Sequence, residues 1–435
     1  MPLSLLYPRS SSVFPASIQW EAQEMARSRV SDRNAMHLLK VFLTVSLCFC
    51  AALATAQDDL PEQPIVVGYF PQWGIHKGFF VKNLISPDAD LMLDQINYSQ
   101  GHIVGNQCAI GDPDADLNYT FSEDDSVDGT ADTPQTPLRG NFHQLQELKS
   151  AYPDVKILIS LEGNANLFAE AAQPANRRSF VASCIRRFIE GKFAEGMEAP
   201  GLFDGIDIDW EYPLKADRFN FIALLGEFRR QLNAAGSNLL LTVAMGDNRA
   251  TYQHLDMSAV SLYVDQVGIM NYDYSGPWSK RTGLIAPLYS SPGDPEKSND
   301  VDSTIRGYQD AGVPESKILL GLPFYAYSWN QVSPVNHGLF QLGQPSRNDI
   351  PYHDILSLQS KFTEYRDPKS LAPWLFDGNT FWTYDDETSI GAKLKYTTEQ
   401  ELHGVMIWEL SGDTEDGDLL RMISEQFKNQ TRETP

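Results

Sequence analysis

Short apolar stretches recur along the chain from residue 65 onwards, and a polar or amphipathic stretch follows each of them. The apolar stretches are rich in the β-branched and aromatic residues that favour strands. Some of the intervening stretches, such as 177–194 and 217–235, have the periodicity of a helix. The pattern therefore predicts eight strands, over residues 65–70, 95–99, 155–161, 202–210, 239–244, 266–272, 317–324 and 404–410.

Strands that alternate with helices indicate an α/β fold with a parallel sheet. A count of eight favours a closed (β/α)8 TIM barrel over an open, doubly wound sheet. No Gly-x-Gly-x-x-Gly motif follows any of the strands, so a dinucleotide-binding fold has no support. The 435 residues are enough for such a barrel, which commonly uses ~250 residues in one domain.

Two connections in this pattern are longer than usual. Residues 101–139, after the second strand, are acidic and rich in Asp, Gly and Pro, and we expect them to form an excursion at the top of the barrel. About 80 residues separate the seventh strand from the eighth, which is too many for a single crossover helix.

The N-terminal segment has the features of a targeting sequence. Residues 41–54 are apolar, Lys40 precedes them and Ala54-Thr55-Ala56 closes the stretch, as in a secretory signal peptide cleaved after about Ala56. We assign 1–35 to an upstream extension without a function, 36–56 to the signal peptide and 57–435 to the folded, secreted, extracellular protein. An uncleaved signal anchor is the alternative, although the stretch is short for a membrane span.

Two cysteines, Cys108 and Cys184, remain after removal of the signal peptide. In an exported protein they either form one disulfide or stay free, and no motif around them indicates a nucleophile. Asn97, Asn118 and Asn429 each begin a glycosylation sequon. Asn97 falls in a predicted buried strand, so Asn118 and Asn429 are the expected acceptors.

The formal net charge of −23 limits the partners of this protein. A surface so acidic repels the phosphates of nucleic acids and the anionic lipids of membranes, so we expect neither as a partner. A neutral or a cationic substrate is compatible with this charge.

The densest cluster of acidic residues is Asp204, Asp207, Asp209 and Glu211, with apolar residues between them. In a strand the last three share one face, because successive side chains point to opposite sides. Like charges on one buried face repel, so the carboxyl groups share protons and their pKa values move apart, which favours a general acid near neutrality. A solvated acidic face or a calcium loop is the alternative; the strand-like alternation argues against both.

The pattern Asp-x-x-Asp-x-Asp-x-Glu, followed by Tyr212-Pro213, resembles the signature of the family 18 glycoside hydrolases, the chitinases and their relatives. The ends of the first, third, sixth, seventh and eighth strands resemble the corresponding elements of that family. The resemblance implies a (β/α)8 barrel with the acidic strand fourth. It also implies a small α+β insertion domain between strands seven and eight, over residues 327–383.

The resemblance further implies a secreted chitinase that hydrolyses β-1,4 bonds between N-acetylglucosamine units with retention, using the substrate's 2-acetamido group as nucleophile. Glu211 would protonate the glycosidic oxygen and later activate water. Asp209 would orient the acetamide, and Asp207 would share a proton with Asp209. Tyr272 would hold the acetamide and stabilise the charged intermediate. No metal or organic cofactor is implied, and Asp204 has a structural role in this interpretation.

The implied substrate-binding residues lie at the ends of the barrel strands, where barrel enzymes place their chemistry. Asp273 would contact the sugar near Glu211, Trp408 would form the floor under it, and Trp278 a platform on the leaving-group side. The remaining members of this set are Tyr69, Trp73, Ser160, Met270, Phe324 and Tyr325. The expected partners are chitin or chito-oligosaccharides, and we expect a monomer.

The sequence departs from the family pattern at two strand ends. Glu162 and Asn164 replace a Gly and a Trp after the third strand, and Tyr327 stands where an Arg is usual after the seventh. Glu162 is expected to raise nearby pKa values. Two alternatives stay open: a chitin-binding lectin on the same fold, which typically lacks the acid, and an endo-N-acetylglucosaminidase acting on N-glycans.

Overall fold

The computed structural model describes residues 63–86, 88, 90–295, 300–346 and 349–430. The assignments of 1–35 and 36–56 lie outside these residues. Within them, no helix is long and apolar enough to cross a membrane.

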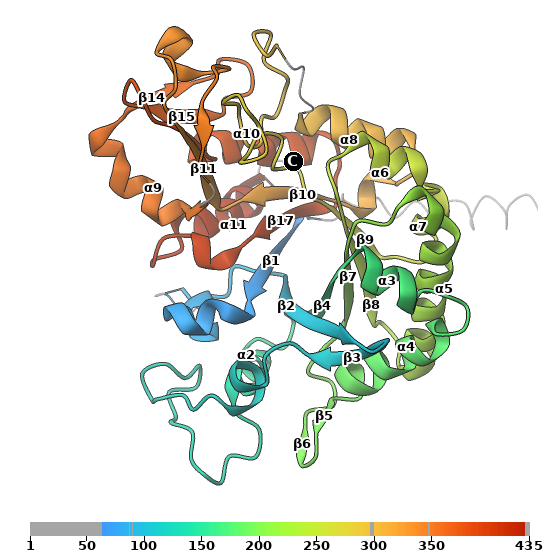
Figure 1. Ribbon diagram of the computed structural model, residues 1–435. Coiled ribbons are helices and arrows are strands. Elements are labelled where there is room, and N and C mark those ends of the chain that lie inside the picture. The colour runs from blue at the N-terminus through green and yellow to red at the C-terminus, as the bar shows by residue number, and fades with distance from the viewer. Residues whose placement is uncertain (1–62, 87, 89, 296–299, 347–348, 431–435) are drawn as a thin grey trace, which may run out of the picture. The chain divides into compact units, whose positions relative to one another are not determined.

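Eight parallel strands of the described chain form a closed barrel (Figure 1). The ring closes because the first strand pairs with the second on one side and with the last on the other. Each strand predicted from the sequence is found, and the predicted barrel is confirmed. In chain order the strands are β1 (Ile65–Pro71), β2 (Gln95–Val104), β4 (Lys156–Asn164), β7 (Gly205–Glu211), β8 (Leu240–Met245), β9 (Gln266–Ile269), β10 (Ile318–Pro323) and β17 (Gly404–Trp408).

Helices follow most of these strands and cover the outside of the barrel (Figure 1). The strand β7 shows how the sequence builds this layer, because Ile206, Ile208 and Trp210 are buried on its outer face. The Trp210 ring stacks on Phe168, with centroids 5.3 Å apart. The main covering helices are α2 (Gly140–Ala151), α3 (Ala165–Ala171), α4 (Arg177–Cys184), α5 (Arg218–Ala235), α6 (Arg249–His254), α7 (Met257–Ser261), α8 (Val301–Asp310), α10 (Glu387–Glu399) and α11 (Asp418–Gln430).

One predicted helix is shorter than its pattern indicates. The helical stretch expected over 177–194 continues from α4 through a π-helical turn and ends at Ile189, and β5 (Lys192–Ala194) then pairs with β6 (Met197–Glu198). Gly191 explains the stop: its φ is +64°, and a Cβ there would lie 2.1 Å from the carbonyl oxygen of Ala199. Only glycine permits this close turn, so the helix cannot continue.

The residues between β10 and β17 in the sequence form a second, smaller sheet, where the fold prediction placed an α+β insertion (Figure 1). It is antiparallel and packs around its own apolar cluster, which includes Trp329, Trp374 and Phe381. The elements of this insertion are β11 (Tyr325–Asn330), β12 (Gln344–Pro345), β13 (Ile350–Pro351), α9 (Tyr352–Leu358), β14 (Thr363–Arg366), β15 (Pro373–Phe376) and β16 (Phe381–Thr383).

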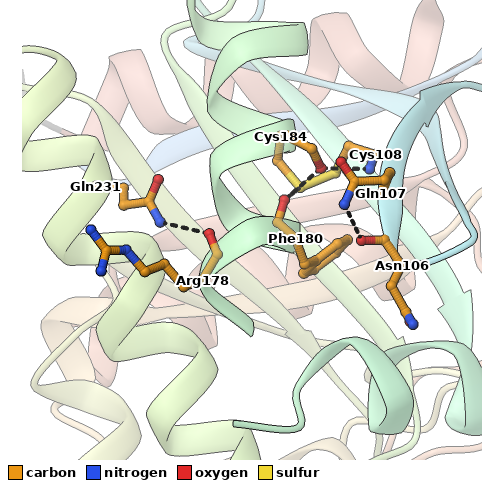
Figure 2. The surroundings of a disulfide bond; sticks show 8 residues. Asn106, Gln107, Cys108, Arg178, Phe180, Cys184 and Gln231 are labelled. Atoms are coloured by element: carbon orange, nitrogen blue, oxygen red, sulfur yellow. Dashed lines mark hydrogen bonds between the residues drawn. A yellow bond between two sulfur atoms is a disulfide. The ribbon is translucent and has the colours of Figure 1, made fainter. Parts of the chain in front are cut away.

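The excursion after the second strand begins with a hairpin that the sequence did not predict. The strand β2 runs on to Val104, and β3 (Gln107–Ile110) returns antiparallel to it. A disulfide between Cys108 and Cys184 ties this hairpin to α4 (Figure 2). Of the two states left open for these cysteines, the structure therefore shows the bonded one.

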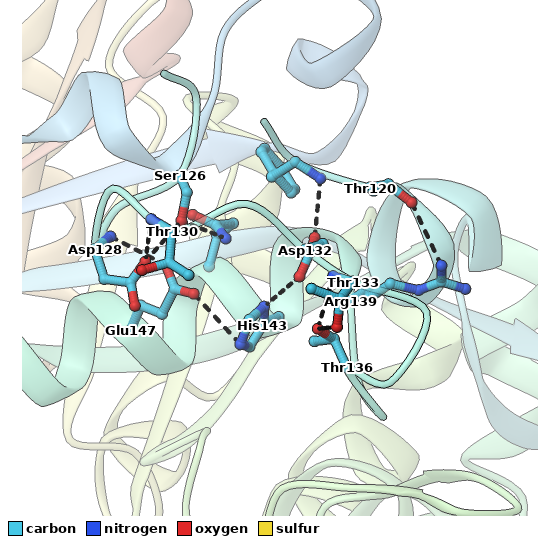
Figure 3. Close-up of polar contacts among 12 residues, drawn as sticks. Thr120, Ser126, Asp128, Thr130, Asp132, Thr133, Thr136, Arg139, His143 and Glu147 are labelled. Atoms are coloured by element: carbon cyan, nitrogen blue, oxygen red, sulfur yellow. Dashed lines mark hydrogen bonds and ion pairs between the residues drawn. The ribbon is translucent and has the colours of Figure 1, made fainter. Parts of the chain in front are cut away.

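The acidic part of the excursion is held against α2 by side-chain contacts (Figure 3). His143 on α2 contacts Asp132 at 3.1 Å and Glu147 at 3.3 Å. Asp132 accepts the backbone N–H of Phe121, and Glu147 accepts the hydroxyl of Ser126. The excursion is therefore attached to α4 by the disulfide at Cys108 and to α2 by the contacts of Ser126 and Asp132.

The sequon asparagines differ in exposure as expected. Asn97 is 2% exposed, because it lies within β2. Asn118 and Asn429 are exposed, so these two positions have the room for a glycan that Asn97 lacks.

Candidate active site

Three carboxyl groups line the inside of β7 in a gradient from the barrel interior to its mouth. The side chain of Asp207 is 1% exposed, that of Asp209 is 5% exposed, and Glu211 at the strand end is exposed. The alternation along the strand puts all three on the face opposite Trp210. The row predicted from the sequence is therefore present.

Asp207 is fixed by three hydroxyl groups, two from the adjacent strands β4 and β8 and one from β1, which does not pair with β7. Tyr69 Oη donates to it at 2.9 Å, Ser160 Oγ at 2.8 Å, and Thr242 Oγ1 at 2.5 Å. Burial raises the pKa of Asp207, and these three donors oppose the rise because they stabilise the ionised form. Asp207 is thus a rigid acceptor at the base of the row.

Asp209 is held much less tightly than Asp207. Its Oδ1 is buried and has no hydrogen-bond partner in the described part of the chain. Burial, and then the charges of Glu211, Asp207 and Glu162, raise its pKa well above the ordinary value. A buried carboxyl group with an unused oxygen costs stability, and it is ready to bind an N–H group of a ligand.

Glu211 stands at the mouth of the barrel and is open to solvent on one side. The surrounding protein removes part of its hydration and raises its pKa, and the charges of Glu162 and Asp273 add to this effect. Glu162 is itself exposed. The expectation that Glu162 raises nearby pKa values is therefore confirmed for both Asp209 and Glu211.

Asp273 follows Tyr272 just past the end of β9. Its backbone is in the left-handed region, with a φ of +65°. Tyr325 Oη donates to one of its oxygens at 2.5 Å, and Tyr327 Oη lies 3.5 Å from the other. The ring of Tyr272 packs edge-on against Tyr325, with centroids 6.0 Å apart. Burial raises the pKa of Asp273, while the two tyrosine hydroxyls lower it.

Aromatic rings extend from the carboxyl row in two directions. The ring of Trp408 lies 5.5 Å from Tyr69 and 6.2 Å from Trp73. Next to these rings is a cavity of about 930 Å³, and Trp73, Trp408, Phe324 and Tyr325 are among the residues that line it. Trp278 is 60% exposed. Flat, partly exposed rings beside acids are suited to stacking on sugar rings.

The structure brings the predicted site residues together at one end of the barrel, with differences in access. Met270 packs in the same small cluster as Tyr69, Tyr272 and Trp408. Phe324 is only 1% exposed, so it supports the cavity wall more than it offers a surface. Asp204 lies apart from the row: it pairs with Lys149 at 2.7 Å and accepts the N–H of Ile157, in agreement with its structural role.

The two departures from the family pattern have distinct structural roles. Asn164 caps α3, because its side chain accepts the backbone N–H groups of Asn166 and Leu167. Tyr327 occupies the space between Asp273 and Trp278, and its ring packs edge-on against Trp278 with centroids 5.7 Å apart. Tyr327 therefore belongs to the site, although the sequence marked it only as a missing arginine.

Two further residues of the site were not identified from the sequence. Thr242 donates to Asp207 from β8, and its position on the inward face of that strand was the only local signal. Asp247, half-buried beyond the end of β8, has its pKa raised to about 6 by burial and by the charge of Asp273. No group of three or more His, Cys, Asp or Glu side chains among the described residues is arranged to hold a metal ion.

Comparison with known proteins agrees with this geometry. The model for "Glycosyl hydrolases family 18" matches residues 65–413. Chitinase C of Streptomyces lividans is 31% identical in an alignment 379 residues long, which covers 82% of this chain and 58% of that protein. The chain likewise covers 61% of chitinase 63 from Streptomyces plicatus, so it spans about three fifths of these curated relatives.

Two solved structures have the same fold. The catalytic domain of the psychrophilic chitinase B from Arthrobacter TAD20 superposes with a TM-score of 0.78 at 32% identity, over 84% of this chain and 96% of that chain. A family 18 N-acetylglucosaminidase from Paenibacillus barengoltzii has a TM-score of 0.67 at 30% identity, over 83% and 99% of the two chains. With its barrel, its acidic strand and these relatives, the chain belongs to the glycosyl hydrolases of family 18.

Proposed function

We propose that this protein is a secreted chitinase that hydrolyses β-1,4 bonds between N-acetylglucosamine units with retention of configuration. One observation carries the proposal: a row of three carboxyl groups in which Asp209 keeps a buried oxygen that has no partner among the described residues, between fixed Asp207 and exposed Glu211. This arrangement has a proton donor at the mouth and a ligand-binding acid behind it. The named chitinases among its relatives support the choice of substrate.

In the first half of the reaction, Glu211 donates its proton to the glycosidic oxygen as the bond from that oxygen to the anomeric carbon breaks. The carbonyl oxygen of the substrate's own acetamide forms the new bond to this carbon, which gives a cyclic oxazolinium ion. Asp209 accepts the acetamide N–H with its free oxygen and so aligns the carbonyl. Tyr272, next to the row, holds the acetamide from the other side.

In the second half, the ionised Glu211 takes a proton from a water molecule, whose oxygen attacks the anomeric carbon from the side that the leaving sugar vacated. The carbon–oxygen bond of the oxazolinium ring breaks and the acetamide re-forms. Two displacements at one carbon give net retention. The raised pKa values of Glu211 and Asp209 keep a proton available in the row at the start of each cycle.

The sugar chain would lie across Trp408, with Trp73 and Tyr69 on one side and Trp278 on the side of the leaving group. Asp273 contacts the sugar near Glu211, while Ser160 and Met270 support this surface from within the barrel. The disulfide between Cys108 and Cys184 supports export, because such bonds persist in oxidising compartments. The enzyme would act as a monomer.

Hydrolysis of a fluorogenic chito-oligosaccharide and of colloidal chitin tests the proposal, with Glu211→Gln as the matched variant. We expect the wild type to cleave both and the variant to bind without cutting. Binding by the wild type without cleavage would favour a lectin. The solved N-acetylglucosaminidase relative gives a specific reason to include chitobiose and a high-mannose glycoprotein. If the protein releases only single sugars, it is an N-acetylglucosaminidase and not a chitinase. If it releases N-glycans from the glycoprotein, N-glycans and not chitin are its substrate.

A further inference from the structure

A second buried carboxyl group lies outside the β7 row, in the excursion after β3. Asp116, on the π-helical turn Asp114–Asn118, is 0% exposed. Tyr98 Oη on β2 donates to one of its oxygens, and Gln72 Nε2 donates to the other at 2.6 Å. The backbone N–H of Asp112 lies 3.4 Å from the same oxygen as Gln72. The donors thus come from three different segments, and none of them is a cation.

Gln72 connects Asp116 to the cavity that Trp73 and Trp408 line. It begins the 3₁₀ turn Gln72–Lys77 that follows β1, and the next residue is Trp73. Its carbonyl oxygen accepts the side-chain amide of Asn141 at 3.4 Å, so residue 72 is held through both its side chain and its backbone. Gly111 packs directly on it, because a Cβ there would lie 2.8 Å from Gln72 Nε2.

We propose that Asp116 is a positioning residue for substrate binding: by holding Gln72 it fixes the turn that sets Trp73 against Trp408 at the wall of the 930 Å³ cavity. The inference rests on the proposed function, which assigns Trp73 to the substrate. Asp116 itself reaches no sugar. It acts on Gln72, the residue before the stacking ring, directly through the Gln72 side chain and indirectly through Tyr98 and Asn141.

The same contact is sensitive to pH near neutrality. Burial raises the pKa of Asp116 to about 7, and the charge of Asp112 adds to the rise while the three donors oppose it. The groups facing Asp116 from the other elements are Tyr98, Gln72 and Asn141; Asp112 on its own segment contacts His76 at 3.4 Å. Three donors and no acceptor suit the ionised carboxylate, so this form holds Gln72 most firmly.

When Asp116 is protonated, its O–H group needs a hydrogen-bond acceptor, and the same network can supply one. Asn141 Nδ2 donates to Tyr98 Oη at 3.0 Å, while Asn141 Oδ1 is buried without a partner in the described chain. Once protonated, Asp116 donates to Tyr98, and the Tyr98 hydroxyl turns towards Asn141, whose amide rotates to present Oδ1. This rotation removes the hydrogen bond from Asn141 to the carbonyl oxygen of Gln72, so protonation of Asp116 loosens the 3₁₀ turn Gln72–Lys77.

Affinity for chitohexaose, measured by calorimetry in the Glu211→Gln background, tests the proposal without turnover. We expect Asp116→Asn to weaken binding about three- to ten-fold, while Asp124→Asn, which removes the same charge from an exposed site on the same excursion, leaves it unchanged. In a Trp73→Ala background, Asp116→Asn should have no further effect, because both changes act on one ring. Equal binding by the two Asp variants, or additive effects with Trp73→Ala, would overturn the proposal.

The pH dependence gives a readout that a purely structural role would not change. The ratio of kcat/KM for a hexamer to that for a short fluorogenic substrate cancels the titration of Glu211 and Asp209. We expect this ratio to rise between pH 6 and 8 with a midpoint of about 7, and to be flat in Asp116→Asn. A flat ratio in the wild type would contradict the inference.

Hydrogen exchange separates this inference from the proposed function, because it needs no sugar. Asp116→Asn should speed the exchange of backbone amides in Gln72–Lys77 by more than Asp124→Asn does. If the Glu211→Gln protein binds no chito-oligosaccharide, the proposed function fails, while exchange still decides whether Asp116 holds the turn. Should Asp116→Asn unfold, Gln72→Met removes the bond between residues 72 and 116 from its other end and takes its place in the affinity and exchange comparisons.

Discussion

Two of the regions of this molecule that contain buried carboxyl groups treat them in opposite ways. Asp385 and Lys393, where the insertion rejoins the barrel through α10, are both 0% exposed and form an ion pair. Asp207 and Asp209 on β7 are almost as buried, and no cation pairs with either among the described residues. Burial raises the pKa of Asp385 as well, but the charge of Lys393 opposes that rise, whereas at Asp209 the neighbouring carboxyl groups add to it, so Asp209 is the group that favours holding a proton.

The difference separates a structural acid from the acid to which the proposed mechanism assigns a role in catalysis. Asp385 also accepts the hydroxyl of Ser389, so its contacts are complete and its charge can hold α10 in place. Asp209 is left incomplete, which costs stability in the free protein and leaves an oxygen for the substrate. Loss of charge should therefore destabilise the protein at the ion pair and should not destabilise it at Asp209.

The largest expected effect is on activity at β7. Asp209→Asn keeps the shape of the side chain but removes its charge and its ability to share a proton with Asp207. We expect kcat/KM to fall about 10²- to 10⁴-fold, with a melting temperature no lower than that of the wild type. A fluorogenic chito-oligosaccharide assay and a thermal melt measure the two quantities. An Asp209→Asn protein that melts well below the wild type would remove the contrast between the regions.

The largest effect on stability is expected at the ion pair. Lys393→Met leaves Asp385 buried without its cation, which should cost about 3–5 kcal/mol of unfolding free energy. Lys395→Met is the matched control, because its side chain is 72% exposed and its pair with Glu399 is 3.6 Å long; it should change stability by less than ~0.5 kcal/mol. Urea unfolding compares them. Similar midpoints for the two variants would mean that the buried pair contributes little.

The pH dependence of stability should also differ between the regions. The pKa of Asp209 is raised in the folded protein above its unfolded value, so its contribution to stability is present at low pH and is lost as pH rises through the folded pKa. Asp209→Asn should therefore become more stabilising relative to the wild type as pH rises from 4 to 8. Unfolding in urea at several pH values gives this difference. A constant difference across the range would show that Asp209 does not titrate differently in the two states.

The smallest effect is expected at Thr242, which helps to fix Asp207. Thr242→Val keeps the volume and removes one of three donors to that carboxyl group. We expect a loss of about 1 kcal/mol of stability and a several-fold drop in kcat, because Asp207 then shares a proton with Asp209 less readily. Ser261→Ala removes a buried hydroxyl bonded to a backbone carbonyl far from the row. It should lower stability to a similar extent and leave kcat unchanged.

Much of the fold was predictable because it follows from local patterns. The apolar and β-branched stretches mark every barrel strand, since each must be buried between the barrel interior and the helices. The acidic row on β7 was predictable for the same reason: alternation along one strand fixes which side chains share a face. Strand boundaries do not follow from these patterns alone, because pairing with neighbouring strands decides where a strand stops. The strand β9, for example, ends at Ile269 and not near residue 272.

Contacts between distant segments could not be read from the sequence. Tyr327 meets Asp273, Cys108 meets Cys184, and Thr242 meets Asp207 only after the barrel has closed. Gln72 and Asp116 are 44 positions apart, and no periodicity links them. Which strand ends become neighbours depends on strand order and register, which arise from the packing of the whole chain.

The sequence by itself determined the order of strands and helices, the acidic row and the aromatic residues at the strand ends, because these depend on residue type and spacing along one segment. The tertiary structure decided which carboxyl groups are paired and which are left to hold protons. Burial and pairing are properties of the surroundings, so Asp385 and Asp209 differ in chemistry although they are the same amino acid.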